Sequence, residues 1–101
     1  MTISYEWRGG FENEAVNRLH AEGFEHRCLD IDWAAQLQGH SLGWVCAREA
    51  GELVGFVNVA WDGGVHAFIL DTMVDGRVRH RGVGTGLIAT AVERSRAAGC
   101  E

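Results

Sequence analysis

Residues 67–88 read AFILDTMVDGRVRHRGVGTGLI, and the chain changes character most sharply within this stretch. Its first eight residues are mostly apolar and belong to an apolar run that predicts a long strand over 65–74. A polar, basic loop follows over 75–81. Over 82–98 the apolar residues recur at helical spacing. The segment therefore predicts a buried strand, a basic glycine-rich loop and a helix, in that order.

The junction between this loop and the helix has the properties of an anion-binding site. The first turn of a helix leaves backbone N–H groups unpaired, and the helix dipole adds partial positive charge there. Glycines at alternate positions from 82 to 86 are expected to keep side chains away from those amides. Arginines at alternate positions from 77 to 81 add positive charge, and no acidic residue occurs between 77 and 92. We therefore expect a phosphate or pyrophosphate group to bind here.

The rest of the chain predicts a single α+β domain of 101 residues. Before the opening segment we expect a strand over 2–8, a helix over 12–22, a short helix capped by Asp30 or Asp32, and strands over 44–48 and 53–60. Gly39 and Gly43 are expected to break the short second helix. Three successive strands joined by tight turns must be antiparallel neighbours. The predicted order is β-α-α-β-β-β-α, a mostly antiparallel sheet with helices packed on it.

Composition and charge exclude several classes of protein. Hydrophobic residues make up 47% of the chain and charged residues 23%, as in globular proteins. The net charge is −5, with −8 in residues 1–76 and +3 in residues 77–101. A local basic excess suits a small anion better than a nucleic acid, so we expect no nucleic-acid partner. We find no membrane span and no signal peptide, and expect a cytoplasmic protein. The cysteines and histidines show no metal-ligand spacing, and no metal is expected.

Three loop motifs compete for the glycine-rich segment. A Rossmann site needs G-x-G-x-x-G after the first strand of a βαβ unit, whereas this chain has G-x-G-x-G after predicted hairpins. A Walker loop needs a Lys, and the chain contains none. The third motif, R-x-x-G-x-G, is matched by Arg79, Gly82 and Gly84. Ordinary turn and helix-start usage of glycine remains the alternative explanation.

With this motif in this order of elements, the chain resembles the GNAT acetyltransferase superfamily. That family places a [QR]-x-x-G-x-[GA] loop after its fourth strand, and the loop amides bind the pyrophosphate of acetyl-CoA. The resemblance implies cofactor contacts from the backbone of Met73 and Val74, which would pair with the pantetheine arm, and from loop residues Arg79, His80, Arg81, Gly82, Val83, Gly84 and Thr85. It also implies an amine acceptor, either a small molecule or a peptide.

The resemblance leaves the catalytic groups open. In the family, a carboxylate or a water that it orders helps to deprotonate the amine. Asp71 is the one carboxylate in the long strand, and the alternatives are a polar residue on an open sheet face or a partner for a nearby Arg. A tyrosine from a later helix often protonates the thiolate, but the only tyrosine here is Tyr5, in the first strand. Trp33 is a core residue or a wall of the acceptor site.

Relative to the family pattern, the chain ends where a fifth strand is expected to begin. The expected fold is therefore incomplete at the C-terminus, and the strand over 67–74 is expected to form an exposed edge. We predict a homodimer or a strand-exchanged oligomer that covers this edge. Three functions stay open: an acetyl-CoA-dependent N-acetyltransferase, a catalytically incomplete CoA-binding or regulatory module, and an interaction domain without a ligand.

Overall fold

A computed structural model describes residues 2–100 and contains the predicted elements in the predicted order. The elements are β1 (Ile3–Trp7), α1 (Asn13–Gly23), α2 (Trp33–His40), β2 (Ser41–Glu49), β3 (Glu52–Trp61), β4 (Ala67–Val74), a single 3-10 turn η1 (Gly76–Val78) and α3 (Val83–Ala97). The prediction of an α+β fold with a mostly antiparallel sheet is confirmed. None of the described helices is long and apolar enough to span a membrane.

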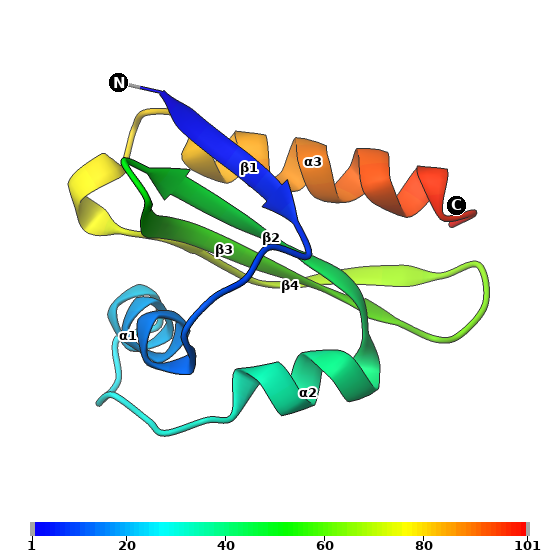
Figure 1. The fold of residues 1–101 in the computed structure, drawn as a ribbon, viewed down its shortest axis with the longest axis horizontal. Coiled ribbons are helices and arrows are strands. Elements are labelled where there is room, and N and C mark those ends of the chain that lie inside the picture. Colours follow the sequence, from blue (N-terminus) through cyan, green and yellow to red (C-terminus); the bar gives the residue numbers. More distant parts are fainter. Residues whose placement is uncertain (1, 101) are drawn as a thin grey trace.

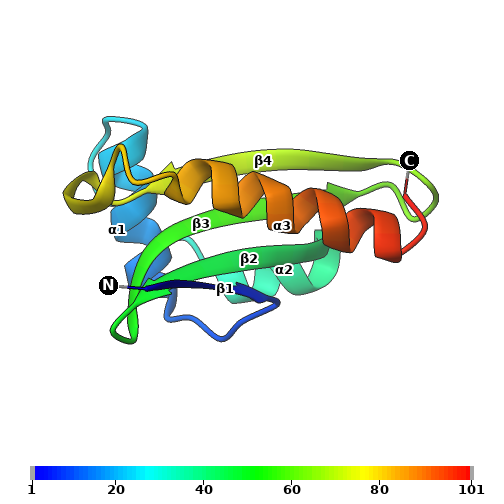
Figure 2. The same ribbon diagram turned by 90° about the horizontal axis from the view of Figure 1, so that it is seen from above.

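The four strands form one antiparallel sheet in the order β1-β2-β3-β4. Helix α3 covers one face of this sheet, and α1 and α2 cover the other, so the sheet is the middle of three layers (Figure 1). Figure 2 shows β1 and β4 as the two edges, with α3 crossing the sheet above them. The chain order therefore brings the N-terminus of α3 next to the end of β4.

Each face of the sheet has its own hydrophobic core. On the α3 face, Val83, Leu87 and Ala91 of the helix pack against apolar strand residues, and all three are at most 2% exposed. On the opposite face, Val16, Leu19, Trp33, Leu37, Phe56 and Met73 belong to a second core. Apolar residues at helical spacing in α1 and α3 turn toward the sheet, and burying them is the main stabilising contribution.

The expectation that Gly39 and Gly43 break the second helix is wrong, because α2 runs through Gly39 and ends at His40, before Gly43 is reached. Strand β2 begins at Ser41 and continues through Gly43, although its pairing with β3 shifts register between these two residues. A Cβ atom at this position would lie 2.4 Å from Cη2 of Trp7, because the indole ring of Trp7 lies against the Gly43 backbone. Gly43 is therefore a packing glycine that admits an aromatic ring from the neighbouring strand.

A buried amide holds the connection between α1 and α2. Asn17 is 3% exposed, and its Nδ2 donates to the carbonyl of Ile31 at 2.9 Å. Its Oδ1 accepts from the backbone N–H of Ile31 at 3.2 Å and from the indole N–H of Trp33 at 3.0 Å. Asp32 then caps α2 by accepting from the N–H of Ala35, as one of the two predicted capping residues. Nothing in the local sequence pattern singles out Asn17 for this role.

Candidate cofactor-binding and catalytic site

The N-terminus of α3 is open in the way that the sequence predicts. Gly82 precedes the helix in a left-handed conformation with φ of 78°, and no side chain of the described residues caps the helix. The first backbone hydrogen bond of the helix runs from the N–H of Gly86 to the carbonyl of Gly82, at 3.0 Å. The amides of Val83, Gly84 and Thr85 precede that bond and have no carbonyl one turn back within the helix. Three N–H donors are therefore available to an anion.

The glycines of this segment do not all serve the same purpose. A Cβ at Gly84 would meet only Cγ2 of Val74, at an ordinary 3.8 Å. A Cβ at Gly86 would lie 2.2 Å from Cζ of Tyr5, because the tyrosine ring packs directly on the helix there. The expectation that Gly86 clears space for a phosphate is therefore wrong. Its missing side chain lets α3 approach β1.

Carboxylates neutralise part of the positive charge that the sequence places on the loop. The hairpin between β2 and β3 brings Glu49 to Arg81, with an N–O distance of 2.6 Å, and Glu52 to Arg77 at 2.6 Å. Arg77 also bonds the buried carboxylate of Asp75 at 2.7 Å. The hydrogen bond from Arg81 is the main reason why the pKa of Glu49 is lowered. Carboxylates far away in the sequence therefore offset two of the three loop arginines.

Arg79 differs from its neighbours because it forms no ion pair within residues 2–100. The residue is exposed, as are His80, Arg81 and Gly82 around it. Its guanidinium can turn toward a bound anion without first breaking a contact with a carboxylate. Among the predicted loop residues, Arg79 is therefore the cation best suited to bind a phosphate.

A shallow groove extends from the helix N-terminus along β4. It is lined by Thr72, Gly84, Thr85, Ile88 and Ala89. Met73 is 1% exposed and its side chain belongs to the core, while Val74 is half-buried beside α3. Any contact of these two residues with a ligand therefore comes chiefly from their backbone. Val83 is also a core residue, so in the predicted site it contributes its N–H group.

Strand β4 contains a bulge at Asp71. Phe56 pairs with Met73 and Asn58 pairs with Leu70, so two residues of β4 lie opposite the single residue Val57. Asp71 has φ of 56°, a left-handed conformation that aspartate tolerates better than most residues. A bulge of this kind redirects the side chain of the inserted residue.

The Asp71 side chain faces a histidine, and within residues 2–100 it forms no ion pair with an arginine, which was one of the two alternatives for it. Its Oδ1 lies 3.8 Å from Nε2 of His20, which comes from α1. Nδ1 of His20 lies 2.6 Å from Nε2 of His26, in the loop that follows the helix. That these three residues lie together could not be predicted from the sequence, because Asp71 is far from the two histidines along the chain.

Two other residues considered from the sequence, Tyr5 and Trp33, are involved in packing. Tyr5 packs against α3, and Trp33 is 2% exposed in the second core. Cys46 and Cys100 are buried and Cys28 is exposed, and burial raises the pKa of the Cys46 thiol to about 11. Within residues 2–100, no three His, Cys, Asp or Glu side chains are grouped so that they could hold a metal ion.

Solved structures share this architecture at low sequence identity. A GNAT acetyltransferase from Streptococcus pneumoniae is 21% identical with a TM-score of 0.73, over 94% of this chain and 69% of that one. An aminoglycoside acetyltransferase from an uncultured soil sample, in complex with sisomicin, is 20% identical with a TM-score of 0.75, over 98% and 73%. N-acetylglutamate synthase from Neisseria gonorrhoeae, complexed with coenzyme A and N-acetyl-glutamate, is 17% identical with a TM-score of 0.75, over 99% and 24%.

These likenesses show that the chain shares its α+β fold with these structures. No curated protein matches the chain. The sequence model of the acetyltransferase (GNAT) family matches residues 6–101, which is nearly the whole chain. The chain therefore belongs to the GNAT acetyltransferase family.

Proposed function

We propose that this chain binds acetyl-CoA and transfers its acetyl group to the amine of a small molecule or a peptide. The pyrophosphate would lie on the amides of Val83, Gly84 and Thr85, next to Arg79 and His80. The pantetheine arm would follow the backbone of Met73 and Val74. The observation that carries this proposal is the uncapped N-terminus of α3 beside the end of β4.

Two of the similar proteins support the choice of ligands. N-acetylglutamate synthase was solved with coenzyme A, and the aminoglycoside acetyltransferase was solved with sisomicin. Bound coenzyme A in the first favours a CoA-type substrate for the common fold. Bound aminoglycoside in the second is consistent with an amine acceptor.

Calorimetric titration with acetyl-CoA tests the cofactor site, with dephospho-CoA and ATP as comparison ligands. We expect binding that prefers acetyl-CoA, and its loss in Gly84→Glu, which places bulk and negative charge where pyrophosphate would lie. Arg79→Ala is expected to weaken binding most clearly at low salt. Unchanged affinity in a folded Gly84→Glu variant would contradict the loop assignment. If acetyl-CoA binds but no amine of the panel causes release of the CoA thiol, the result would favour a CoA-binding module over an enzyme.

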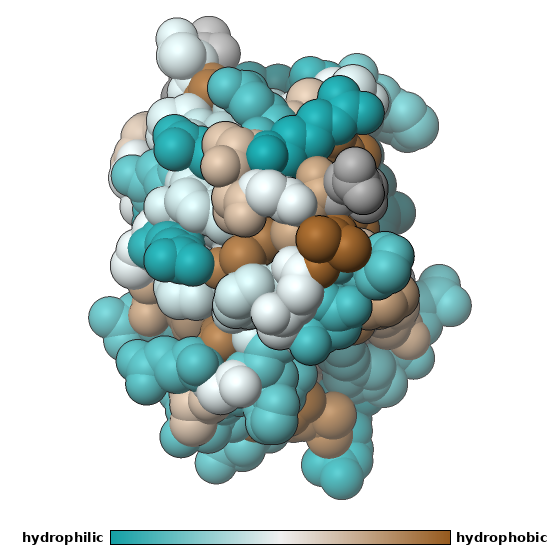
Figure 3. Space-filling model, turned by 90° about the vertical axis from the view of Figure 1, so that its right-hand side faces the viewer, coloured by the Kyte–Doolittle hydropathy of each residue, from teal (hydrophilic) through white to brown (hydrophobic). Residues whose placement is uncertain are grey.

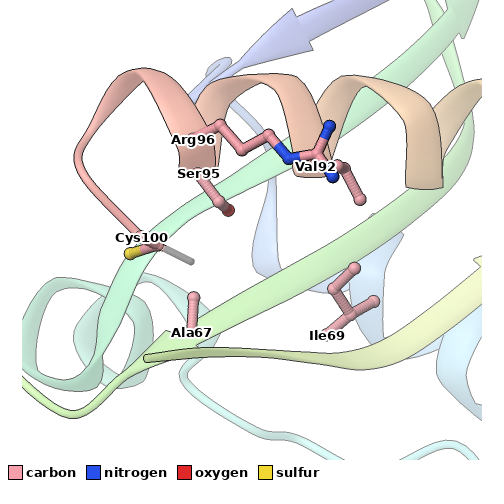
Figure 4. A pocket seen from close by; sticks show the side chains of 6 residues that line it. All are labelled: Ala67, Ile69, Val92, Ser95, Arg96 and Cys100. Atoms are coloured by element: carbon pink, nitrogen blue, oxygen red, sulfur yellow. The ribbon is translucent and has the colours of Figure 1, made fainter. Parts of the chain in front are cut away.

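We further propose that a second copy of the chain covers the outer edge of β4. Phe68, Ile69 and Leu70 are 54%, 38% and 48% exposed, so hydrophobic side chains protrude from both faces of this edge strand. Figure 3 views the molecule from the end where the loop between β3 and β4 lies, and it shows hydrophobic surface among polar residues there. Beneath the strand lies a pocket between β4 and α3, lined by Ala67, Ile69, Val92, Ser95, Arg96 and Cys100 (Figure 4).

Charge and space suggest how two copies would pair. An antiparallel pairing of the two edges about Ile69 would place Asp71 of each copy opposite Ala67 of the other, which avoids two opposed carboxylates. This register leaves the backbone of Met73 and Val74 free for the cofactor. Light scattering at tens of micromolar is expected to show a dimer for the parent chain and a monomer for Ile69→Lys. A monomeric parent chain that does not aggregate would overturn this proposal.

A further inference from the structure

The side chains of His20 and Asp71 face each other without a hydrogen bond. The distance of 3.8 Å between Nε2 of His20 and Oδ1 of Asp71 is beyond the normal range. Both side chains are partly accessible, with 18% of His20 and 27% of Asp71 exposed. They lie on the α1 side of the sheet, at the bulge of β4 and two residues before Met73.

A chain of hydrogen bonds determines which nitrogen of His20 carries a proton. Nδ1 of His26 lies 2.6 Å from the carbonyl oxygen of Arg27, and because a carbonyl only accepts, Nδ1 of His26 must be protonated. In neutral His26, Nε2 is therefore the acceptor, and it faces Nδ1 of His20 at 2.6 Å. Nδ1 of His20 must then donate. When both rings are neutral, Nε2 of His20 is left with a free lone pair directed toward Asp71.

Oδ1 of Asp71 and Nε2 of neutral His20 are both hydrogen-bond acceptors, so a group that binds to both must be a donor. The carboxylate of Asp71 accepts hydrogen bonds, and neutral His20 presents a lone pair, so the space beside them favours a positively charged group with several N–H bonds. A primary ammonium has this character. The neighbouring surfaces are aromatic, since the rings of Phe24 and Trp33 lie 4.8 Å and 5.4 Å from that of His20.

We propose that the acceptor's primary ammonium group binds between Asp71 and His20, and that Nε2 of His20 removes its proton. Asp71 contributes the attracting charge and His20 is the general base. This inference rests on the proposed function, because the acetyl donor would lie along the neighbouring residues of the same strand. It assigns a role to Asp71 that the sequence left open, and a base in α1 that the sequence did not indicate.

The step balances in atoms and charge. One proton moves from the ammonium to Nε2 of His20, and the freed amine lone pair forms a C–N bond to the thioester carbonyl carbon. The C–S bond breaks, and the second proton lost from nitrogen ends on the CoA thiolate. His20 then returns its proton to solvent. Because Nδ1 of His20 is bonded to His26, the proton can leave through that ring, which is also partly exposed.

The surroundings of His20 keep it in the basic form. Burial lowers its pKa, the charge of Asp71 opposes this change, and His26 lowers the pKa further. Within residues 2–100, Asp71 from β4 and His26 from the following loop are the charged or titratable groups that face it, while α2 contributes the uncharged Trp33. A histidine with a lowered pKa is neutral at pH 7 and can accept a proton there.

The first test is nitrogen NMR of the imidazoles, with the His20 signals assigned by their loss in His20→Gln. We expect His20 at neutral pH to carry its proton on Nδ1 and not on Nε2. Titration with n-butylamine is expected to shift the His20 signals in the parent chain and to do so much less in Asp71→Asn. A proton on Nε2 of His20, or no response to the amine, would overturn the proposal even if the chain does not turn over.

The second test measures thiol release from acetyl-CoA with a panel of primary amines, in a Cys28→Ser background that removes the exposed thiol. His20→Gln is expected to lower kcat about 100-fold or more and to abolish the rise in rate with pH, while acetyl-CoA affinity stays unchanged. Asp71→Asn is expected to raise KM for the amine. The matched control is a second His–Asp pair, His66 and Asp62, whose atoms lie 3.1 Å apart at the exposed β3–β4 hairpin. His66→Gln and Asp62→Asn are expected to change neither value.

The two proposals fail in different ways. Absence of acetyl-CoA binding in calorimetry would overturn the proposed function. Normal acetyl-CoA binding and full activity in His20→Gln would leave the proposed function standing and remove His20 as the base.

Discussion

Gly84 and Gly86 lie two positions apart at the start of α3, yet they are glycines for different reasons. Gly84 has room for a methyl group, whereas the ring of Tyr5 occupies the place of a side chain at Gly86. The first glycine is thus available for ligand binding, and the second is required by packing. The R-x-x-G-x-G motif includes only the first, which agrees with this division.

Two alanine substitutions separate these roles. Gly86→Ala is expected to lower the free energy of unfolding by about 1–3 kcal/mol, because the new Cβ overpacks against Tyr5. Gly84→Ala is expected to leave stability within about 1 kcal/mol of the parent chain, since alanine also favours a helix over glycine. Its methyl group is expected to leave acetyl-CoA binding largely intact, because the family motif admits alanine at this position and the new Cβ would meet only Val74. Urea denaturation and calorimetry measure the two effects, and equal destabilisation by both substitutions would contradict this assignment.

At the scale of elements, the connection between α1 and α2 depends on one buried amide. Asn17 is bonded to both backbone groups of Ile31 and to the Trp33 indole, and it thereby joins the two helices that cover one face of the sheet. The loop that it closes contains His26. The same amide therefore supports the position of the hydrogen-bonded histidines.

Asn17→Ala is expected to destabilise the chain by about 1–3 kcal/mol, because the buried Trp33 indole N–H and the partly buried backbone groups of Ile31 lose their partner. Asn13 is a matched control on the same helix. Its Nδ2 bonds Asp32 at 3.0 Å and its Oδ1 accepts from the N–H of Ala34 at 2.9 Å, but both contacts are exposed to water. Asn13→Ala is therefore expected to cost less. A larger loss of stability in Asn13→Ala than in Asn17→Ala, measured by thermal unfolding, would contradict the role given to Asn17.

At the scale of the whole molecule, Asp75 joins the end of β4 to the charged network of the loop. Its carboxylate is buried, caps η1 through the N–H of Arg77 at 2.9 Å and bonds the Arg77 side chain. The hydrogen bond from the Arg77 side chain is the main reason why its pKa is lowered, and burial opposes this change. A lowered carboxyl pKa stabilises the folded chain above the unfolded value of about 3.9 and ceases to do so as the pH falls through the folded value.

Acid pH is therefore expected to destabilise the chain partly through Asp75. The free energy of unfolding of the parent chain should fall when the pH is lowered from neutral through the ordinary range of aspartate and below it. Asp75→Asn keeps an oxygen for the Arg77 N–H but removes the titrating charge, so it should be less stable at neutral pH and lose less on acidification. Denaturation curves at several pH values measure this difference. Parallel losses in both proteins would show that Asp75 is not involved.

Local signals in the sequence were sufficient for the elements and for the loop that precedes α3. Alternation indicated β1, helical spacing indicated α1 and α3, and Asp30 or Asp32 offered a cap for α2, of which the structure uses Asp32. The strand, basic loop and glycine-rich helix start were readable over 67–88 because each depends on a few neighbouring residues. The position of Gly99 after α3, with φ of 96°, is another such local signal.

Contacts between distant segments were decided only by the tertiary structure. Glu49 and Glu52 reach the loop arginines because the β2–β3 hairpin ends beside the start of α3. Gly86 faces Tyr5 because α3 crosses the edge strand β1. His20 meets Asp71 because α1 packs under β4 and the bulge turns the carboxylate toward it. The physical reason is the same in each case: the sequence pattern shows which face of an element is buried, but the packing of one element on another decides which side chains meet across the interface.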